Sequence, residues 1–425
     1  MLVRTLAYWS NWPVCVVVLI PLSWLLGVSV YTPLIVMWLS VTLAGYILIA
    51  NRNTVSSDTG ARFVSFPVLA FVAYALFSFF WSTPANFSTT NVTNPLLVIL
   101  TCLSIPILYS YFSTELIHPK QGKIVCLLIT VVGPILLLLI VLDSHVMNGP
   151  LIFEREMRAE NGRLNFSLAV NQNPNSASYF FGIGVLVTLR ALRFEFASKA
   201  LKLSCWIGLI VYSIMFTFCG SISAGIGLLA AVVVNASFYK DRTALISVAV
   251  MFIAFLVGLP LIEFLCECSI AEQKRGDSAA ARLAVWRGMI ELWLEQPLLG
   301  HGMFTPLKIA VNSGKTYSSH SILLHQLAGG GIIGIMLVIA IMIQTFNRAV
   351  NCARLGEITP LCWLIFVSTI VLTHKHMVFL PEPYLWLIVW GPLLAPHIVL
   401  NALAISAGIY RKPPTDNKHF NKFTI

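Results

Sequence analysis

Long apolar stretches, separated by clusters of charged residues, proline or asparagine, recur along the whole chain. Each is close to the 20 or so residues with which a helix crosses the hydrocarbon core of a bilayer. Charges and turn residues bound the stretches in the manner of transmembrane helices. The pattern predicts twelve such helices, near 8–28, 30–50, 63–82, 94–113, 124–143, 175–192, 203–220, 222–239, 243–264, 320–346, 359–376 and 383–404.

Two connections depart from this pattern, because residues 144–174 and 265–319 are long and mix charged with apolar side chains. In the second, "ARLAVWRGMIELWLEQPLLGHG" is too short and too charged for a span. We expect Ser278 to cap a helix that runs to about Glu295 and stops before Pro297. We interpret it as an amphipathic helix at the membrane interface, with its tryptophans at headgroup level.

Composition agrees with a membrane protein. The chain has 425 residues, of which 58% are hydrophobic and only 10% charged, whereas soluble proteins carry about 25% charged residues. We therefore predict an all-α polytopic membrane protein, with one integral domain over 1–425 and a tail at 405–425. The nine cysteines are scattered. Those in apolar stretches, such as Cys205, Cys219 and Cys362, are expected to be small core residues.

Lysine and arginine set the orientation, because positively charged connections tend to stay in the cytoplasm. One alternate set of connections holds 17 of them and the other holds 9, so the first set, with both termini, is predicted to be cytoplasmic. The nine exceptions all lie in 144–174 and 265–319. One interpretation is that long connections escape the rule. The other is a binding site for an anion on the outer face.

Four arginines are candidates for that site. Arg158 is interleaved with glutamates, whereas Arg163 stands apart from them and is the best anion ligand in the first connection. In the second, Arg282 shares one helical face with Trp286, Met289 and Trp293. Arg287 diverges from Arg282 by about 140°. Its alternative is a surface ion pair with Glu291, four residues on.

Two histidines follow where the chain re-enters the predicted membrane. His320 comes after two serines that can cap the next helix, and it is a candidate base or phosphate ligand. His325 lies deeper and on another face. A structural role is the alternative for both. The glycines at 329–331 permit either close helix packing or a break in the helix.

These residues resemble the signature of the O-antigen ligase and O-antigen polymerase superfamily. Its pattern is an arginine, a tryptophan four residues on, Pro-x-x-Gly-x-Gly, a variable loop, and His-Asn heading a helix with Gly-x-x-Gly. The matching residues are Arg282, Trp286, Pro297, Gly300, Gly302, His320, Gly331 and Gly334. The chain departs from the pattern in two places. Ile222 and Ser223 stand where the family commonly has an outer arginine followed by glycine. Ser321 stands where the family has asparagine.

The resemblance implies a GT-C-type membrane glycosyltransferase with a helical periplasmic loop. The donor would be a glycan on undecaprenyl diphosphate at the periplasmic face of the bacterial inner membrane. A ligase moves the glycan to the lipid A core, and a polymerase moves it to another lipid-linked repeat unit. The number of spans and the moderate outer loop favour the ligase.

The chemistry of this donor fits arginines, because charge builds on the departing diphosphate. Arg163, Arg282 and Arg287 are the proposed donor ligands and His320 the proposed base, with Arg158, Trp286 and His325 as further candidates. No Walker A motif or Asp-x-Asp pair is present, so we expect neither ATP nor a metal cofactor. A transporter or flippase is the rival class, but acidic residues are nearly absent from the span interiors. No nucleic-acid partner is expected.

Overall fold

The computed structural model describes residues 59–82, 130, 174–194, 199–219, 221–240, 242–243, 245–253, 275–310, 316–319, 321–373 and 391–406. This part of the chain is mostly helical, as predicted. The elements are α4 (Thr59–Phe77), η1 (Ser78–Phe80), α8 (Pro174–Ala191), α9 (Lys199–Phe218), α10 (Ile222–Tyr239), α12 (Arg275–Glu295), β1 (Ile309–Ala310), β2 (Thr316–Tyr317), α13 (Ile322–Arg354), α14 (Thr359–Thr373) and α16 (Gly391–Ser406).

The helices α4, α8, α9, α10 and α14 coincide with predicted apolar stretches to within a few residues. The prediction for α13 was wrong at its end, because this helix continues past residue 346 to Arg354. The reason is a buried stripe at helical spacing, formed by Thr345, Ala349 and Cys352, that continues beyond the first charged residue. Packing of these buried side chains thus stabilises the last turns of α13, although the residues there are polar on average.

Two of the described helical segments, Lys199–Thr217 and Ile322–Arg354, are long and apolar enough to cross a membrane. Shorter apolar helices cover Phe66–Phe80, Ser178–Ala191, Ser223–Tyr239 and Thr359–Leu372. The predicted spans 8–28, 30–50 and 94–113 lie outside the described residues. The total of twelve spans and the GT-C-type architecture therefore stay predictions.

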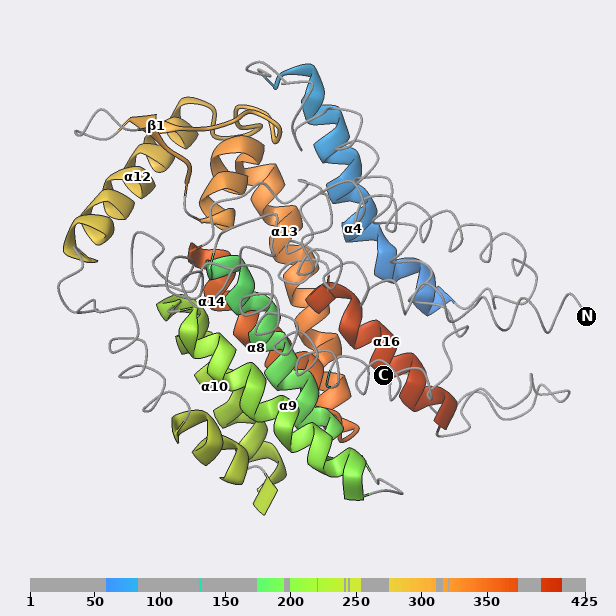
Figure 1. Cartoon of the computed structure of the whole chain (residues 1–425). Helices are drawn as coiled ribbons and strands as arrows, with labels where there is room; N and C mark the ends of the chain where they lie inside the picture. Colours follow the sequence, from blue (N-terminus) through green and yellow to red (C-terminus); the bar gives the residue numbers. More distant parts are fainter. Residues whose placement is uncertain are drawn as a thin grey trace, which may run out of the picture.

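The helix α13 is the long central element of the described bundle (Figure 1). It packs against α4, α12, α14 and α16, while α10 packs on α14 and α8 packs on α9. Large side chains such as Tyr212 of α9 and Phe366 of α14 are fully buried between these helices. Cys205, Cys219 and Cys362 are buried free thiols, which confirms their predicted core position.

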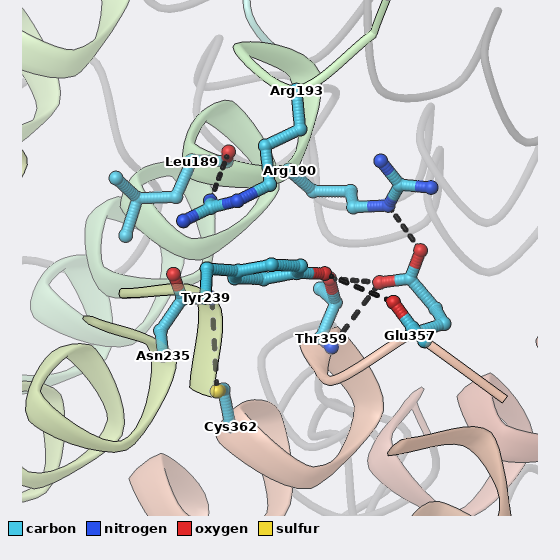
Figure 2. Close-up of polar contacts among 9 residues, drawn as sticks. Leu189, Arg190, Arg193, Asn235, Tyr239, Glu357, Thr359 and Cys362 are labelled. Carbon is cyan, nitrogen blue, oxygen red and sulfur yellow. Dashed lines mark hydrogen bonds and ion pairs between the residues drawn. The ribbon is translucent and has the colours of Figure 1, made fainter. Parts of the chain in front are cut away.

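At one end of the bundle, polar side chains join α8, α10 and the turn between α13 and α14 (Figure 2). The carboxylate of Glu357 is buried, forms an ion pair with Arg190 and accepts a hydrogen bond from the backbone N–H of Thr359 at 3.2 Å. The guanidinium carbon of Arg193 lies 3.7 Å from the centre of the Tyr239 ring. We call these five residues the inner cluster, since they lie at the ends of helices predicted to face the cytoplasm.

The opposite end of the bundle carries α12, the two short strands and the first turns of α13 (Figure 1). The strands form an antiparallel pair, with Ile309 opposite Tyr317 and Ala310 opposite Thr316. The described part of the predicted outer connection 265–319 therefore lies at this end. Their orientation relative to a membrane stays a prediction.

Candidate functional site

The helix α12 is longer than the sequence suggested. It begins at Arg275, so Ser278 lies inside it and the predicted cap was wrong. The run "RGDSAAA" explains the extension, because alanine is the strongest helix former and carries the helix upstream. The end at Glu295, just before Pro297, is confirmed.

One face of α12 packs onto the first turns of α13. Val285 and Met289 are almost fully buried, and Met289 forms a small core with Leu307 and Ala328. Trp293 is partly buried against the same core. The predicted face of Trp286, Met289 and Trp293 is thus the packed one, and the tryptophans lie half-buried against protein.

Arg282 lies toward the beginning of α12, and its side chain is exposed. Tyr179, a buried residue in the second turn of α8, lies within the electrostatic range of this guanidinium group. Arg282 therefore lies toward the end of the bundle at which α8 begins. Sequence reasoning missed Tyr179; the signal was a phenol within an otherwise apolar stretch.

Arg287 has a different environment. Its Nε lies 3.2 Å from Oε1 of Glu291, and both side chains are largely exposed. The surface ion pair is therefore formed, as the alternative interpretation had it. Such exposed pairs contribute about 0–1 kcal/mol and leave the guanidinium free to exchange partners.

The loop "PLLGHG" after α12 is hydrogen-bonded, backbone to backbone, into a break in α13. The break is at Gly331, whose φ of 60° and ψ of −163° are not helical. The N–H groups of His301 and Gly302 donate to the carbonyls of Ala328 and Gly329, at 3.0 and 2.8 Å. These bonds replace those that α13 loses.

Beyond the break, α13 donates the hydrogen bonds and the loop accepts them. The N–H groups of Ile332 and Ile333 donate to the carbonyls of Pro297 and Leu298, at 2.9 and 3.4 Å. The loop therefore satisfies the first N–H groups of the second part of α13 and serves as its cap. The glycine run both packs closely and breaks the helix, so the two expected roles occur together.

Two motif glycines are required by this close approach. A Cβ atom on Gly300, which has a φ of 65°, would lie 2.5 Å from the carbonyl oxygen of Gly329. A Cβ atom on Gly331 would collide with the carbonyl of Leu298. Each position combines a positive φ with a backbone neighbour, so only glycine fits. We call this interdigitation of 297–303 with 328–333 the loop–helix junction.

The outer end of α4 supports the loop–helix junction. The hydroxyl of Tyr74 lies 3.0 Å from the carbonyl oxygen of Leu299 and 2.8 Å from that of Gly330, and so bridges loop and helix. The backbone N–H of Met303 donates to Oγ of Ser78 at 3.2 Å. Phe79 and Phe304 stack with ring centres 4.3 Å apart. Nothing in the apolar run around Tyr74 had indicated this role.

His320 lies outside the described residues, but both its neighbours are described and buried. Ser321 is the N-cap of α13, and its Oγ accepts a hydrogen bond from the N–H of Leu324 at 3.3 Å. The prediction that the serines before His320 cap this helix was therefore wrong. Asparagine and serine are both favoured N-caps, so the departure from the family's His-Asn keeps the local structure.

Buried polar atoms gather in the first turns of α13. His325 and Gln326 are almost fully buried, and neither ring nitrogen of His325 nor Oε1 of Gln326 has a hydrogen-bond partner among the described residues. The indole N–H of Trp286 also lacks one there. Burying a polar atom without a hydrogen-bond partner costs free energy of folding, which makes these residues candidates for ligand contacts.

The other candidates are not placed. Arg158 and Arg163 lie outside the described residues, so their approach to Arg282 stays a prediction. Ile222, at the position where the family has an arginine, begins α10 directly after the turn from α9. In the described ranges, no three His, Cys, Asp or Glu side chains gather as a metal ion would require.

Comparison with known proteins fits this geometry. A family model described as O-antigen ligase matches residues 205–339, which run from α9 through α12 and the loop–helix junction into α13. A protein of Pseudomonas aeruginosa named O-antigen ligase is 33% identical over 122 residues, which cover 27% of this chain and 29% of that relative. The match thus spans less than a third of the relative. Together, the two matches show that this segment of the chain is similar to O-antigen ligases.

Proposed function

We propose that the protein is a glycosyltransferase that moves O-antigen polysaccharide from undecaprenyl diphosphate to the lipid A core. The reaction takes place at the periplasmic face of the bacterial inner membrane, and both termini lie in the cytoplasm. The observation that carries the proposal is the coincidence of the matched segment with the frame of α12, the loop–helix junction and α13. Arg282 is part of that frame, on α12.

In the proposed reaction, a hydroxyl oxygen of the acceptor attacks the anomeric carbon of the donor. The bond from that carbon to the diphosphate oxygen breaks, and the lipid diphosphate leaves with the electron pair. His320 takes the proton of the hydroxyl. Arg282 and Arg163 stabilise the charge that develops on the diphosphate, because guanidinium groups match phosphate oxygens with paired hydrogen bonds.

The remaining candidates have supporting roles in this proposal. Arg287 contributes to the positive field from its exposed pair with Glu291, and Arg158 does so from the first connection. Trp286 and His325 contact the glycan through polar groups that lack partners among the described residues. The reaction needs neither ATP nor a metal, since the donor is already activated by its diphosphate.

Deleting the gene and analysing the lipopolysaccharide tests the function. We expect long glycan to accumulate on the lipid carrier while the lipid A core stays bare. A core that carries a single repeat unit would indicate a polymerase instead. Unchanged glycan on the core would contradict both transfer functions and would favour a transporter of another substrate.

Complementing the deletion with His320→Ala tests the proposed base. We expect the variant to insert into the membrane at the level of the unmodified protein but to leave the core bare, because no group would accept the hydroxyl proton. Ser319→Ala is the matched control, because it changes the neighbouring buried residue and leaves the imidazole. Transfer by His320→Ala at the control's rate would remove His320 from the mechanism.

A further inference from the structure

The helix α12 has a second apolar face, opposite the one that packs on α13. Leu283, Ile290 and Leu294 have exposed fractions of 65%, 42% and 62%. They lie within about 40° of one another around the helix, because each residue turns the helix by about 100°. Val285 and Met289, which are buried, lie on the other side.

Two further exposed leucines connect α12 with α13. Leu298 and Leu299 of the loop are 65% and 47% exposed and extend the row beyond the end of α12. The carbonyl of Leu298 accepts the hydrogen bond from Ile333, so the loop leucines adjoin the exposed side of α13. We call the five exposed side chains of α12 and the loop the outer apolar stripe; they are Leu283, Ile290, Leu294, Leu298 and Leu299.

The exposed side of α13 begins at the break. From Ile322 to Gly331 no residue of α13 is exposed, whereas Ile332, Ile333 and further large apolar residues to Phe346 are. At 1.5 Å per residue, the stretch from Ile332 to Phe346 is about 21 Å long. This length fits inside a hydrocarbon core of about 30 Å. The break at Gly331 therefore marks the height at which the exposed apolar band ends.

We propose that the outer apolar stripe lies on the bilayer and contacts the acyl chains of its outer leaflet just below the headgroups. The occupant is bilayer lipid, because the loop that carries Leu298 and Leu299 is hydrogen-bonded to α13 at the break, where the exposed apolar band of α13 begins. The exposed ion pair of Arg287 and Glu291 borders the stripe, as expected for an interfacial helix. In this arrangement the leucines face the lipid, whereas Trp293 packs against protein.

The inference rests on α13 crossing the membrane and does not depend on the transfer reaction. A fluorescent amino acid is introduced at position 294 of the full chain, which is reconstituted in phosphatidylcholine vesicles. Position 295, an exposed glutamate next to the stripe, is the matched control, and position 339 in the exposed band of α13 reports the span. Quenching by lipids brominated on their acyl chains is compared with quenching by iodide in the water.

We expect brominated lipid to quench position 294 several-fold more strongly than position 295, and iodide to show the reverse order. Quenching of 294 by iodide alone would overturn the proposal in favour of a hydrated surface. Protection from both quenchers would also overturn it, because protein would then cover the stripe. Absence of lipid quenching at 339 would contradict the membrane span on which the inference rests, while leaving glycan transfer to be judged by the deletion experiment.

Discussion

Arg282 and Arg287 lie five residues apart on α12, yet their surroundings differ. Arg287 forms an exposed ion pair with Glu291, whereas Arg282 lies within the electrostatic range of Tyr179 in α8. We predict that Arg282→Ala abolishes transfer of glycan to the lipid A core, and that Arg287→Ala retains most of it. The measurement is the glycan ladder on lipopolysaccharide at matched amounts of membrane protein. Equal loss in both variants would show that total charge, and not position, controls the reaction.

Ser321 supports a second prediction for a single residue. Its Oγ caps α13 next to His320, and asparagine can make the same bond. Ser321→Asn is therefore expected to match the unmodified protein in stability and transfer. Ser321→Ala should lower stability by about 1 kcal/mol, the usual cost of a lost cap. Resistance to unfolding by sodium dodecyl sulfate in mixed micelles measures the difference. If Ser321→Ala is as stable as Ser321→Asn, capping of α13 is not the reason for a serine at position 321.

Single residues also show what the sequence alone could predict. The type of Arg287's partner followed from a spacing of four, because an exposed pair on one helix needs no tertiary information. The cap of α13 did not follow, because three serines near residue 320 are equivalent until the backbone fixes which one precedes the first helical turn. Tyr74 was missed for a related reason, since the two carbonyl groups that its hydroxyl contacts lie 225 and 256 residues away along the chain.

Between elements, the loop–helix junction depends on glycine for two reasons, positive φ and lack of space. Gly356 has a φ of 91° but no atom within 4 Å of where a Cβ would be. It therefore separates the two effects. We predict that Gly356→Ala costs about 1–3 kcal/mol from backbone strain alone and keeps transfer. Gly331→Ala also forces a positive φ on alanine and adds a collision with the carbonyl of Leu298, so the junction should open and transfer should be lost.

Protease accessibility of the loop 297–303 in membrane vesicles measures opening of the junction independently of transfer. We expect Gly331→Ala to be cut faster than Gly356→Ala. Equal cutting and equal transfer in the two variants would mean that the contact with Leu298 is not what requires glycine.

The elements themselves were largely predictable, because apolar length and Pro297 fix helix ends locally. The junction was not, because hydrogen bonds between backbones leave no side-chain pattern in the sequence.

Across the whole molecule, the inner cluster lies at the opposite end of the bundle from α12 and Arg282. Glu357→Gln leaves Arg190 without its charged partner and is expected to destabilise the protein by about 1–3 kcal/mol. Transfer per correctly inserted molecule should change little, because the cluster is remote from the proposed site. Unfolding in mixed micelles and the glycan ladder measure the two effects separately. A stable variant that cannot transfer would show that this end of the bundle takes part in the reaction.

The arrangement of the described helices could be anticipated in part. The alternation of basic and neutral connections predicted which helix ends lie together, and the inner cluster brings three of the basic ends into contact. The contacts of α13 with four other helices were beyond reach, because apolar helices of similar composition give no sign of which neighbours they choose. The order of packing depends on shape, and shape is set by side chains from distant segments.

The backbone bonds of the loop–helix junction have a consequence for how related proteins can differ. A hydrogen bond between main-chain groups is indifferent to side chains, provided that the glycines keep the two chains close. Leu298 and Leu299 can therefore be exchanged for other apolar residues without loss of the loop–helix junction. The glycines of this loop are fixed by the backbone contacts, whereas the side chains at its other positions can vary. The loop thus has a fixed backbone and a variable surface beside the site. Relatives that act on different glycans can then diverge in this loop while inheriting an unchanged frame.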